Sequence, residues 1–214
     1  MIFYVIQISL FNLINDNIGN IHNSEERLSY IIDITLRTRT LILLNGGYLE
    51  LNDTAYADLL NTTLGDLRNS ATNLKIAQTE LSLATASLSA DQLELINPSN
   101  IQMLYLPYPN MPSVYDFSMW EAIMEIVVSA YRISTLDLSE LTDMYPTAYF
   151  VMQNNLNSVY TALKSSTDAI INESNNNRES NLNTFLYLLI AASCSLFFSI
   201  LFLIPVINKV KKNK

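Results

Sequence analysis

An uncharged apolar run of 24 residues near the C-terminus constrains this chain most. From Thr184 to Ile207 the sequence reads TFLYLLIAASCSLFFSILFLIPVI, without a charged side chain. About 20 such residues in a helix cross the hydrocarbon core of a bilayer. The polar flanks NESNNNRESN and KVKKNK do not continue the run as an amphipathic pattern, which argues against a buried core helix. The sequence therefore predicts a transmembrane helix over residues 184–207.

The charges on either side of this run indicate its orientation. Residues 208–214 hold four lysines and no acid, whereas residues 1–183 hold twenty acidic and eight basic residues, a net charge of −12. Short cytoplasmic flanks are enriched in Lys and Arg. We therefore expect residues 208–214 to be a basic cytosolic tail and the body to be extracytoplasmic. A weaker alternative is a tail-anchored trafficking protein with its body in the cytosol.

Small residues recur within the run at Ala191, Ser195 and Ser199, four positions apart. Such a strip lets a second helix approach closely, so we interpret it as a face for packing against other transmembrane helices. The alternative is that small residues are merely tolerated there. The predicted partners of this segment are the lipid bilayer and other membrane helices.

The N-terminal segment is apolar but short. Residues 2–14, IFYVIQISLFNLI, are too few to span a bilayer, and they lack the basic start and the cleavage site of a signal peptide. We interpret residues 1–22 as the end of an upstream membrane helix or as an amphipathic first turn of the body. Residues 23–183 are the predicted extracytoplasmic domain.

Low glycine content and long apolar periodicity predict an all-α body, an elongated antiparallel four-helix-bundle-like domain. The first helix is expected over residues 23–45, because Asn23 and Glu26 fit a capping box. Its predicted apolar stripe is Leu28, Ile31, Ile32, Leu36, Ile42 and Leu43. Gly46 and Gly47 predict a turn, and Asn52-Asp53-Thr54 offers N-caps to a second helix antiparallel to the first.

Leucine recurs every seven residues in the second predicted helix, at Leu60, Leu67, Leu74, Leu81, Leu88 and Leu95. The intervening seam positions turn polar and no basic region precedes them, so a DNA-binding zipper is not indicated. We expect one helix of about 40 residues from Thr54, with a stripe that packs in a bundle.

Four prolines between Pro98 and Pro112 exclude a regular helix there and predict a long ordered connection. A third helix, the most buried, is expected within DFSMWEAIMEIVVSAYRIS. Pro146 should start a fourth, with Leu156, Tyr160, Leu163, Thr167 and Ile170 at heptad-like spacing. This last helix should continue into the membrane span.

Aromatic and methionine side chains gather around the proline-rich connection. Ten of the 21 aromatics lie between residues 105 and 160, and six of the seven methionines between 103 and 152. Such side chains line ligand pockets, although they also fill cores beneath long loops. The candidate ligand-binding residues are Tyr105, Tyr108, Trp120 and Tyr131, for a ligand that the sequence does not identify.

Several functions find no support in the sequence. An acidic body lacks the basic face that nucleic acid requires. The single histidine, His22, and the single cysteine, Cys194, leave no catalytic or metal-binding pattern, so we expect neither an enzyme nor a cofactor. Asn52, Asn61 and Asn172 fit the N-glycosylation pattern, although chance matches are expected in a chain this rich in Asn, Ser and Thr.

Three stretches together resemble one family: MWEAIMEIVVSAYRIS, YFVMQNNLNSVYTALKSSTDAI and ASCSLFFSILFLIPVINKVKKN. They are similar to a region of the TmcB-like large polytopic membrane proteins of ciliates, many of which carry a PAS domain. The resemblance covers roughly residues 24–214. It implies a helical extracytoplasmic segment followed by a span and a cytosolic continuation, in a sensory or signalling protein.

This resemblance supplies no catalytic residue. Because the chain has neither the family's array of upstream spans nor its cytosolic domain, we expect it to be part of a longer protein. The function predicted is a non-enzymatic, receptor-like membrane segment that relays to the cytosol. The alternative is a structural or adhesive membrane protein that mediates assembly.

Overall fold

A computed structural model describes residues 2–85, 88, 90–106 and 111–212 of the chain. The chain is mostly helical, which confirms the predicted class. It divides into two compact units: Asn15–Ile171, and Met1–Ile14 with Asn172–Lys214. Each unit is described by itself.

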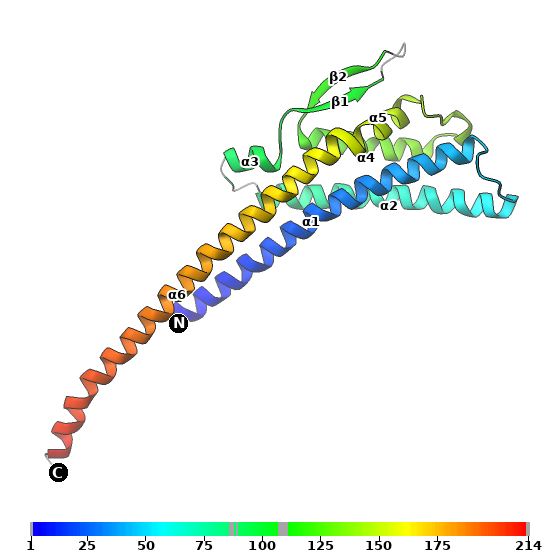
Figure 1. Cartoon of the computed structure of the whole chain (residues 1–214). Coiled ribbons are helices and arrows are strands. Elements are labelled where there is room, and N and C mark those ends of the chain that lie inside the picture. The colour runs from blue at the N-terminus through cyan, green and yellow to red at the C-terminus, as the bar shows by residue number, and fades with distance from the viewer. Residues whose placement is uncertain (1, 86–87, 89, 107–110, 213–214) are drawn as a thin grey trace. The chain divides into compact units, whose positions relative to one another are not determined.

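The first two helices form an antiparallel hairpin, as predicted (Figure 1). Helix α1 spans Ile2–Asn45 and α2 spans Asp53–Thr85. Between them Gly47 has a positive φ of 66°, and the amide of Tyr48 donates to the carbonyl of Leu43, which closes the end of α1 as a Schellman motif. The side chain of Asn52 accepts from the amide of Ala55 at 2.8 Å and caps α2, as predicted.

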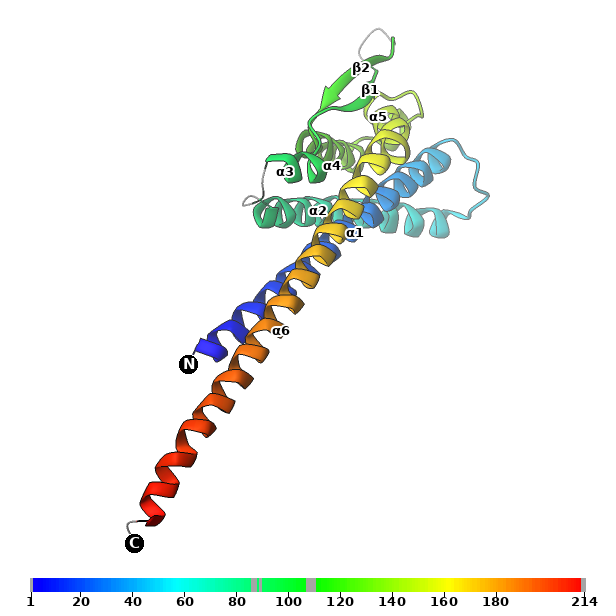
Figure 2. The same ribbon diagram turned by 60° about the vertical axis from the view of Figure 1, so that its left-hand side comes forward.

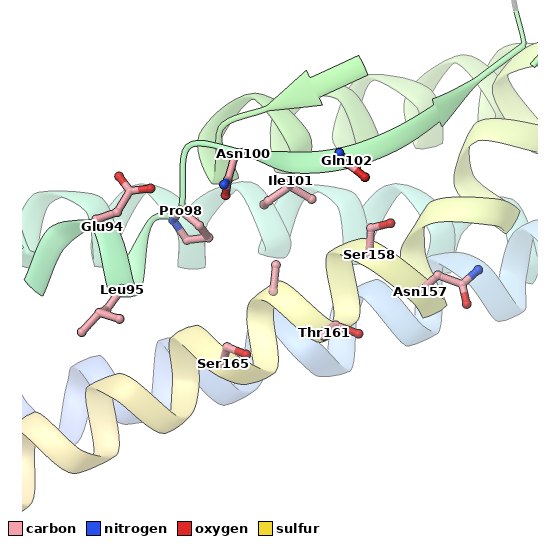
Figure 3. A pocket seen from close by; sticks show the side chains of 11 residues that line it. Glu94, Leu95, Pro98, Asn100, Ile101, Gln102, Asn157, Ser158, Thr161 and Ser165 are labelled. Atoms are coloured by element: carbon pink, nitrogen blue, oxygen red, sulfur yellow. The ribbon is translucent and has the colours of Figure 1, made fainter. Parts of the chain in front are cut away.

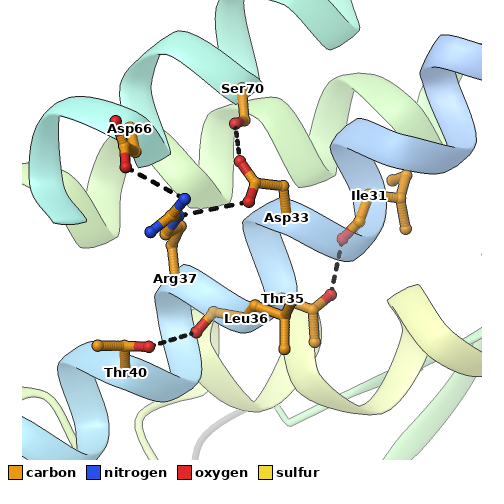
Figure 4. Close-up of polar contacts among 8 residues, drawn as sticks. All are labelled: Ile31, Asp33, Thr35, Leu36, Arg37, Thr40, Asp66 and Ser70. Atoms are coloured by element: carbon orange, nitrogen blue, oxygen red, sulfur yellow. Dashed lines mark hydrogen bonds and ion pairs between the residues drawn. The ribbon is translucent and has the colours of Figure 1, made fainter.

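Polar pairs connect α1 and α2 along their length. The residue numbers of the α2 partners decrease as those of the α1 partners increase, as in an antiparallel pair of helices. The pairs are Asn23 with Glu80, Arg27 with Gln78, Asp33 with Ser70, and Arg37 with Asp66. Figure 4 shows the latter two, with Arg37 Nη2 3.2 Å from Asp66 Oδ2 and Arg37 Nε 3.3 Å from Asp33 Oδ1. These ion pairs are about one-third exposed, so each contributes about 0.2–1 kcal/mol.

The predicted start of the first helix at Asn23 is wrong. Asn23 lies inside α1, where its amide donates to Glu80 at 3.0 Å. A capping pattern starts a helix only where the preceding residues leave helical geometry, and residues 2–22 contain no proline to force this. The predicted stripe is also partly wrong. Ile31 is buried, but Ile32 and Leu36 are 37% and 55% exposed, and Ile34 and Leu41 occupy the core instead.

The second helix is shorter than predicted. It ends at Thr85, and a separate helix α3 spans Ala90–Ile96. Leu67, Leu74 and Leu81 are fully buried, as the seven-residue repeat indicates, but Leu95 is 65% exposed. The Ser- and Thr-rich sequence after Leu81 has low helix propensity, and the hydroxyl of Thr85 donates to the carbonyl of Leu81.

The proline-rich connection contains an antiparallel hairpin that the sequence analysis missed. Strand β1 spans Ile101–Tyr105 and β2 spans Ser113–Phe117, with Met103 opposite Tyr115. In β1 the side chains of Ile101 and Met103 are buried and that of Gln102 is exposed, the alternation of a half-buried strand. Both views show the hairpin beside α4 and α5 (Figures 1 and 2).

The third predicted helix is confirmed as α4, Met119–Thr135. Ser118 and Glu121 form its capping box, and Arg68 of α2 donates to the carbonyl of Ser134 at its C-terminal end. Ala122, Ile123, Ile126 and Ala130 are fully buried, in line with the expectation of a strongly buried helix. A single 3₁₀ turn, η1, follows at Leu138–Glu140.

Pro146 starts the fourth helical segment, as predicted. It consists of α5 (Pro146–Asn154), a π-helical turn η2 (Asn155–Val159) and α6 (Tyr160–Lys212). The inner face follows Val159, Leu163, Thr167 and Ile170, all buried. Leu156 is 49% exposed, against the prediction, because the π turn shifts the register of the face.

The main core of residues 15–171 draws on α1, α2, α4, α5, η2 and α6, and also on Ile101 and Met103 of β1. Burial of β1 in this core means that the predicted four-helix-bundle arrangement is not confirmed. A second, smaller cluster joins Leu81, Ile96 and Ile170.

The unit formed by residues 1–14 and 172–214 contains the predicted span. Within the described residues one helix is long and apolar enough to cross a membrane, and its most apolar stretch is not buried in the protein. Leu186, Leu196, Phe198 and Phe202 are each more than half exposed. An exposed face of this kind suits lipid and differs from a core helix.

Candidate functional site

Three of the four predicted ligand residues lie within the described part of the chain, on two different elements. Tyr105 lies on β1, and Trp120 and Tyr131 lie on α4. Tyr108 lies outside the described residues. Tyr131 is eleven residues beyond Trp120, roughly 16 Å along the helix, and its hydroxyl is 2.7 Å from that of Thr72 on α2.

Tyr105 bonds to Glu125, a residue that also lines the hollow beside Trp120. The Tyr105 hydroxyl donates to Glu125 Oε1 at 2.9 Å, and its ring packs on Phe150 with ring centroids 5.1 Å apart. Partial burial, with Glu125 beside it, raises the pKa of Tyr105. Trp120 lies 42% exposed beside a hollow of about 370 Å³. This α4 hollow is lined by Asp116, Phe117, Trp120, Glu121, Met124, Glu125 and Val128.

A larger hollow, about 660 Å³, lies between the α3–β1 segment and the helix that faces it. We call it the β1–α6 groove. Figure 3 shows its side chains from α3 and β1 on one side and from η2 and α6 on the other. Its lining consists of Glu94, Leu95, Pro98, Asn100, Ile101, Gln102, Asn157, Ser158, Thr161, Ala162 and Ser165. Its volume falls within the range of small-ligand sites.

Asn154, the last residue of α5, fixes the position of β1, which forms one wall of the groove. Its Oδ1 accepts from the amide of Leu104 at 2.7 Å, and its Nδ2 donates to the carbonyls of Leu104 and Phe150, each at 2.8 Å. These bonds hold one end of β1 against the helix. The segment before β1 is held by the carbonyl of Pro98, which accepts from the amide of Met119 at 2.9 Å.

The groove is nearly uncharged, and apolar atoms make up more of its exposed surface than polar atoms do. Amides and hydroxyls predominate among the lining side chains, and the single charged group is the carboxylate of Glu94. Glu94 Oε1 accepts from the amide and the hydroxyl of Ser99, at 3.0 and 2.9 Å, and these bonds lower the pKa of its carboxyl. Glu94 is therefore ionised at neutral pH.

Next to the groove, a buried polar network surrounds Arg27. The guanidinium of Arg27 is fully buried; Nη1 donates to Gln78 Oε1 at 2.7 Å, and Nη2 to the hydroxyls of Ser166 and Ser24 at 3.0 and 3.2 Å. Desolvation lowers the pKa of Arg27 to about 9. No Asp or Glu in the described part of the chain pairs with it.

The Arg27 network ties three helices to the edge of the groove. Ser166 of α6 donates to the carbonyl of Ile96 at 2.6 Å, and Thr167 lies 2.7 Å from Ser24 of α1. Ile96 ends α3, and Ser166 follows the groove residue Ser165. The sequence analysis missed this network, although Arg27 among the apolar positions of α1 was a signal that a buried polar layer was present.

The structure places the remaining predicted sites without testing them. Ala191, Ser195 and Ser199 lie on one exposed face of α6, and the Ser199 hydroxyl donates to the carbonyl of Ser195 at 2.8 Å. Asn52, Asn61 and Asn172 are all exposed. Over the described residues, no group of three His, Cys, Asp or Glu side chains could hold a metal ion.

Comparison with known proteins found no matching family model, no matching curated protein and no matching solved structure. The resemblance to the TmcB-like proteins of ciliates therefore stays a prediction.

Proposed function

We propose that this chain is a membrane-anchored, receptor-like binding protein without catalytic activity. The observation that carries this proposal is that α6 supplies one wall of the β1–α6 groove, through Thr161 and Ser165, and is the same helix that contains the apolar segment. A ligand in the groove would touch the element that enters the bilayer.

The contacts of α6 with α1 are suited to a relay. Ser166 and Thr167 contact Arg27 and Ser24 through hydroxyls rather than through large interlocking side chains. Hydroxyl bonds can exchange partners as a helix shifts by an ångström or two, a displacement typical of signalling helices. We infer that ligand binding shifts α6 against α1 and thereby moves the basic tail.

Anchoring and sidedness are tested with tags at each terminus of the full chain in native membranes. We expect resistance to carbonate extraction, and protection of the N-terminal tag from protease added to the cytosolic side. Extraction by carbonate would overturn the anchoring. Digestion of the N-terminal tag from the cytosolic side would reverse the topology and favour the tail-anchored alternative.

The relay is tested by cross-linking α1 to α6. In a Cys194→Ala background, Ser24→Cys with Thr167→Cys places two thiols where hydroxyls now lie 2.7 Å apart. We expect ligand-dependent changes in tryptic cleavage at the exposed Arg178 to vanish on oxidation and to return on reduction. Equal responses in both states would refute the relay.

Tryptophan fluorescence reports on binding to the α4 hollow, because Trp120 is the only tryptophan of the sequence and lines this hollow. A ligand bound there would change tryptophan fluorescence and lose affinity in Trp120→Ala. A ligand whose affinity is unchanged by Trp120→Ala does not bind in the α4 hollow, and the β1–α6 groove is then the candidate site.

A further inference from the structure

The hydrogen bonds of Asn154 show which backbone groups of β1 point away from β2. In an antiparallel pair, alternate residues turn both backbone groups toward the partner strand or both away from it. The amide and carbonyl of Leu104 bond to the side chain of Asn154, so they point away from β2. Gln102 is two residues earlier in the same strand and therefore also turns its amide and carbonyl away from β2.

The outward backbone groups of Leu104 and Gln102 differ in their hydrogen-bond partners. The carboxamide of Asn154 gives Leu104 one acceptor and one donor, which are the two bonds that a neighbouring strand would provide. Gln102 is exposed, lines the β1–α6 groove, and has no hydrogen-bond partner for its outward backbone groups among the residues that the structure describes. The side chain of Asn154 thus satisfies the edge at Leu104, whereas the outward amide and carbonyl of Gln102 are free to bond to a ligand.

The wall opposite Gln102 carries a row of uncommitted hydroxyls. Ser158, Thr161 and Ser165 follow one another along η2 and α6 at helical spacing, and all three line the groove. Their hydroxyls make no hydrogen bond within the described part of the chain, so they are free to bond to a ligand. A groove between a strand edge and a helix is the geometry in which proteins bind extended peptides by strand addition.

We propose that the β1–α6 groove binds an extended peptide segment of a partner protein, which adds to β1 as a third strand at Gln102. This proposal rests on the proposed function, because it names the ligand of the groove that α6 lines. One peptide residue would exchange two backbone hydrogen bonds with Gln102, and its neighbours would meet Thr161 and Ser165. Glu94 is the only charged lining group, so the preferred peptide is neutral or carries a Lys or Arg beside Glu94.

The lining disfavours other ligand classes. No Lys, Arg or His lines the groove, which argues against phosphates and carboxylates. No aromatic ring lines it either, although aromatic stacking is the usual contribution to nucleobase recognition. A backbone donor and acceptor beside neutral hydroxyls fit a peptide bond best.

The test uses the full chain in lipid nanodiscs and a displayed library of random heptapeptides. Gln102→Pro removes the outward amide hydrogen together with the side chain, and proline is tolerated at a strand edge where no ladder bond is lost. Gln102→Ala is the matched control, because it removes the side chain and keeps that amide. Circular dichroism and the denaturation midpoint establish that both variants keep the fold.

We expect the library to give peptides that bind the wild type and Gln102→Ala within threefold of each other and that bind Gln102→Pro about tenfold more weakly. Methylation of one backbone nitrogen of a selected peptide should abolish binding, while methylation of its two neighbours should not. Equal binding to both variants, or a library without binders, would overturn the proposal. Either failure leaves the membrane anchoring standing, because carbonate extraction tests the anchoring without a ligand.

Discussion

Arg27 Nη1 lies 2.7 Å from Gln78 Oε1, so a buried guanidinium on α1 is held by a neutral amide on α2. Water is excluded from this side chain, and its Nε has no hydrogen-bond partner within the described residues. A buried charge without a carboxylate is costly, since hydroxyls and an amide replace only part of its hydration. The network therefore favours alignments of α1, α2 and α6 in which an amide and hydroxyls still accept hydrogen bonds from the guanidinium.

Removing the amide should destabilise the fold strongly. We expect Gln78→Leu to lower the free energy of unfolding by about 3 kcal/mol, because Arg27 then stays buried with fewer acceptors. Urea titration of the full chain in detergent micelles, followed by circular dichroism, measures this. Lys75→Ala, on the exposed face of α2, is the control and should change stability by less than about 0.5 kcal/mol.

The double variant Arg27→Met with Gln78→Leu should recover most of that loss. Removing the charge together with its acceptor leaves apolar side chains of similar size, and such replacements are often neutral or stabilising. If the double variant is as unstable as the sum of the two single variants, the charge is not the source of the cost.

Asn154 should be required for the β hairpin. Asn154→Ala removes three hydrogen bonds and leaves the backbone of Leu104 unpaired, so we expect a loss of about 2–3 kcal/mol. Hydrogen exchange should show faster exchange in β1 than in α2. Lys164→Ala, exposed on α6, is the matched substitution and should leave both rates unchanged.

Stability should fall in acid through the α4 capping box. Glu121 accepts from the amide and hydroxyl of Ser118, at 2.9 and 2.8 Å, and these bonds lower the pKa of Glu121 below its ordinary value in the folded state. Its contribution to stability is therefore present above the pKa of the unfolded carboxyl and is lost as pH falls through the lower pKa of the folded state. Glu121→Gln keeps the acceptor and does not titrate.

Denaturation midpoints between pH 7 and pH 3 test this. We expect Glu121→Gln to resemble the wild type at pH 7 and to lose less stability than the wild type on acidification. Parallel pH profiles for the two proteins would show that the capping box does not contribute to acid sensitivity.

A charge at the centre of the apolar segment should hinder membrane insertion. We expect Leu196→Arg to raise the apparent free energy of insertion by about 3 kcal/mol, because arginine is poorly accommodated at mid-bilayer. A translocation assay that reports on glycosylation measures insertion efficiency. Asn176→Arg adds the same charge outside the run and should insert normally; equal insertion of both variants would contradict a span over residues 184–207.

Several features were predictable because they depend on residues close together in sequence. The turn at Gly47, the cap at Asn52, the start of the fourth helical segment at Pro146 and the buried Leu67, Leu74 and Leu81 each follow from local backbone preference or helical period. The apolar segment follows from composition alone. Local rules failed at Asn23, where a capping pattern lies inside a helix.

The groove and the network were not predictable in this way. Gln102 and Thr161 are distant in sequence, and neither belongs to a motif. The π turn at Asn155–Val159 changes which side chains face the core, and no local signal marked it. The contact between the hydroxyls of Tyr131 and Thr72 joins residues 59 positions apart, and no local pattern indicated it.

The sequence by itself determined the helical class, the α1–α2 hairpin and one helix apolar enough to cross a membrane, because hydrophobic period and backbone preference act over a few neighbouring residues. Only the tertiary structure decided that Arg27 is buried, that Asn154 closes one position of the β1 edge, and that Gln102 is left open beside α6. Those outcomes depend on which distant groups satisfy one another once water is excluded, and that choice is made by packing.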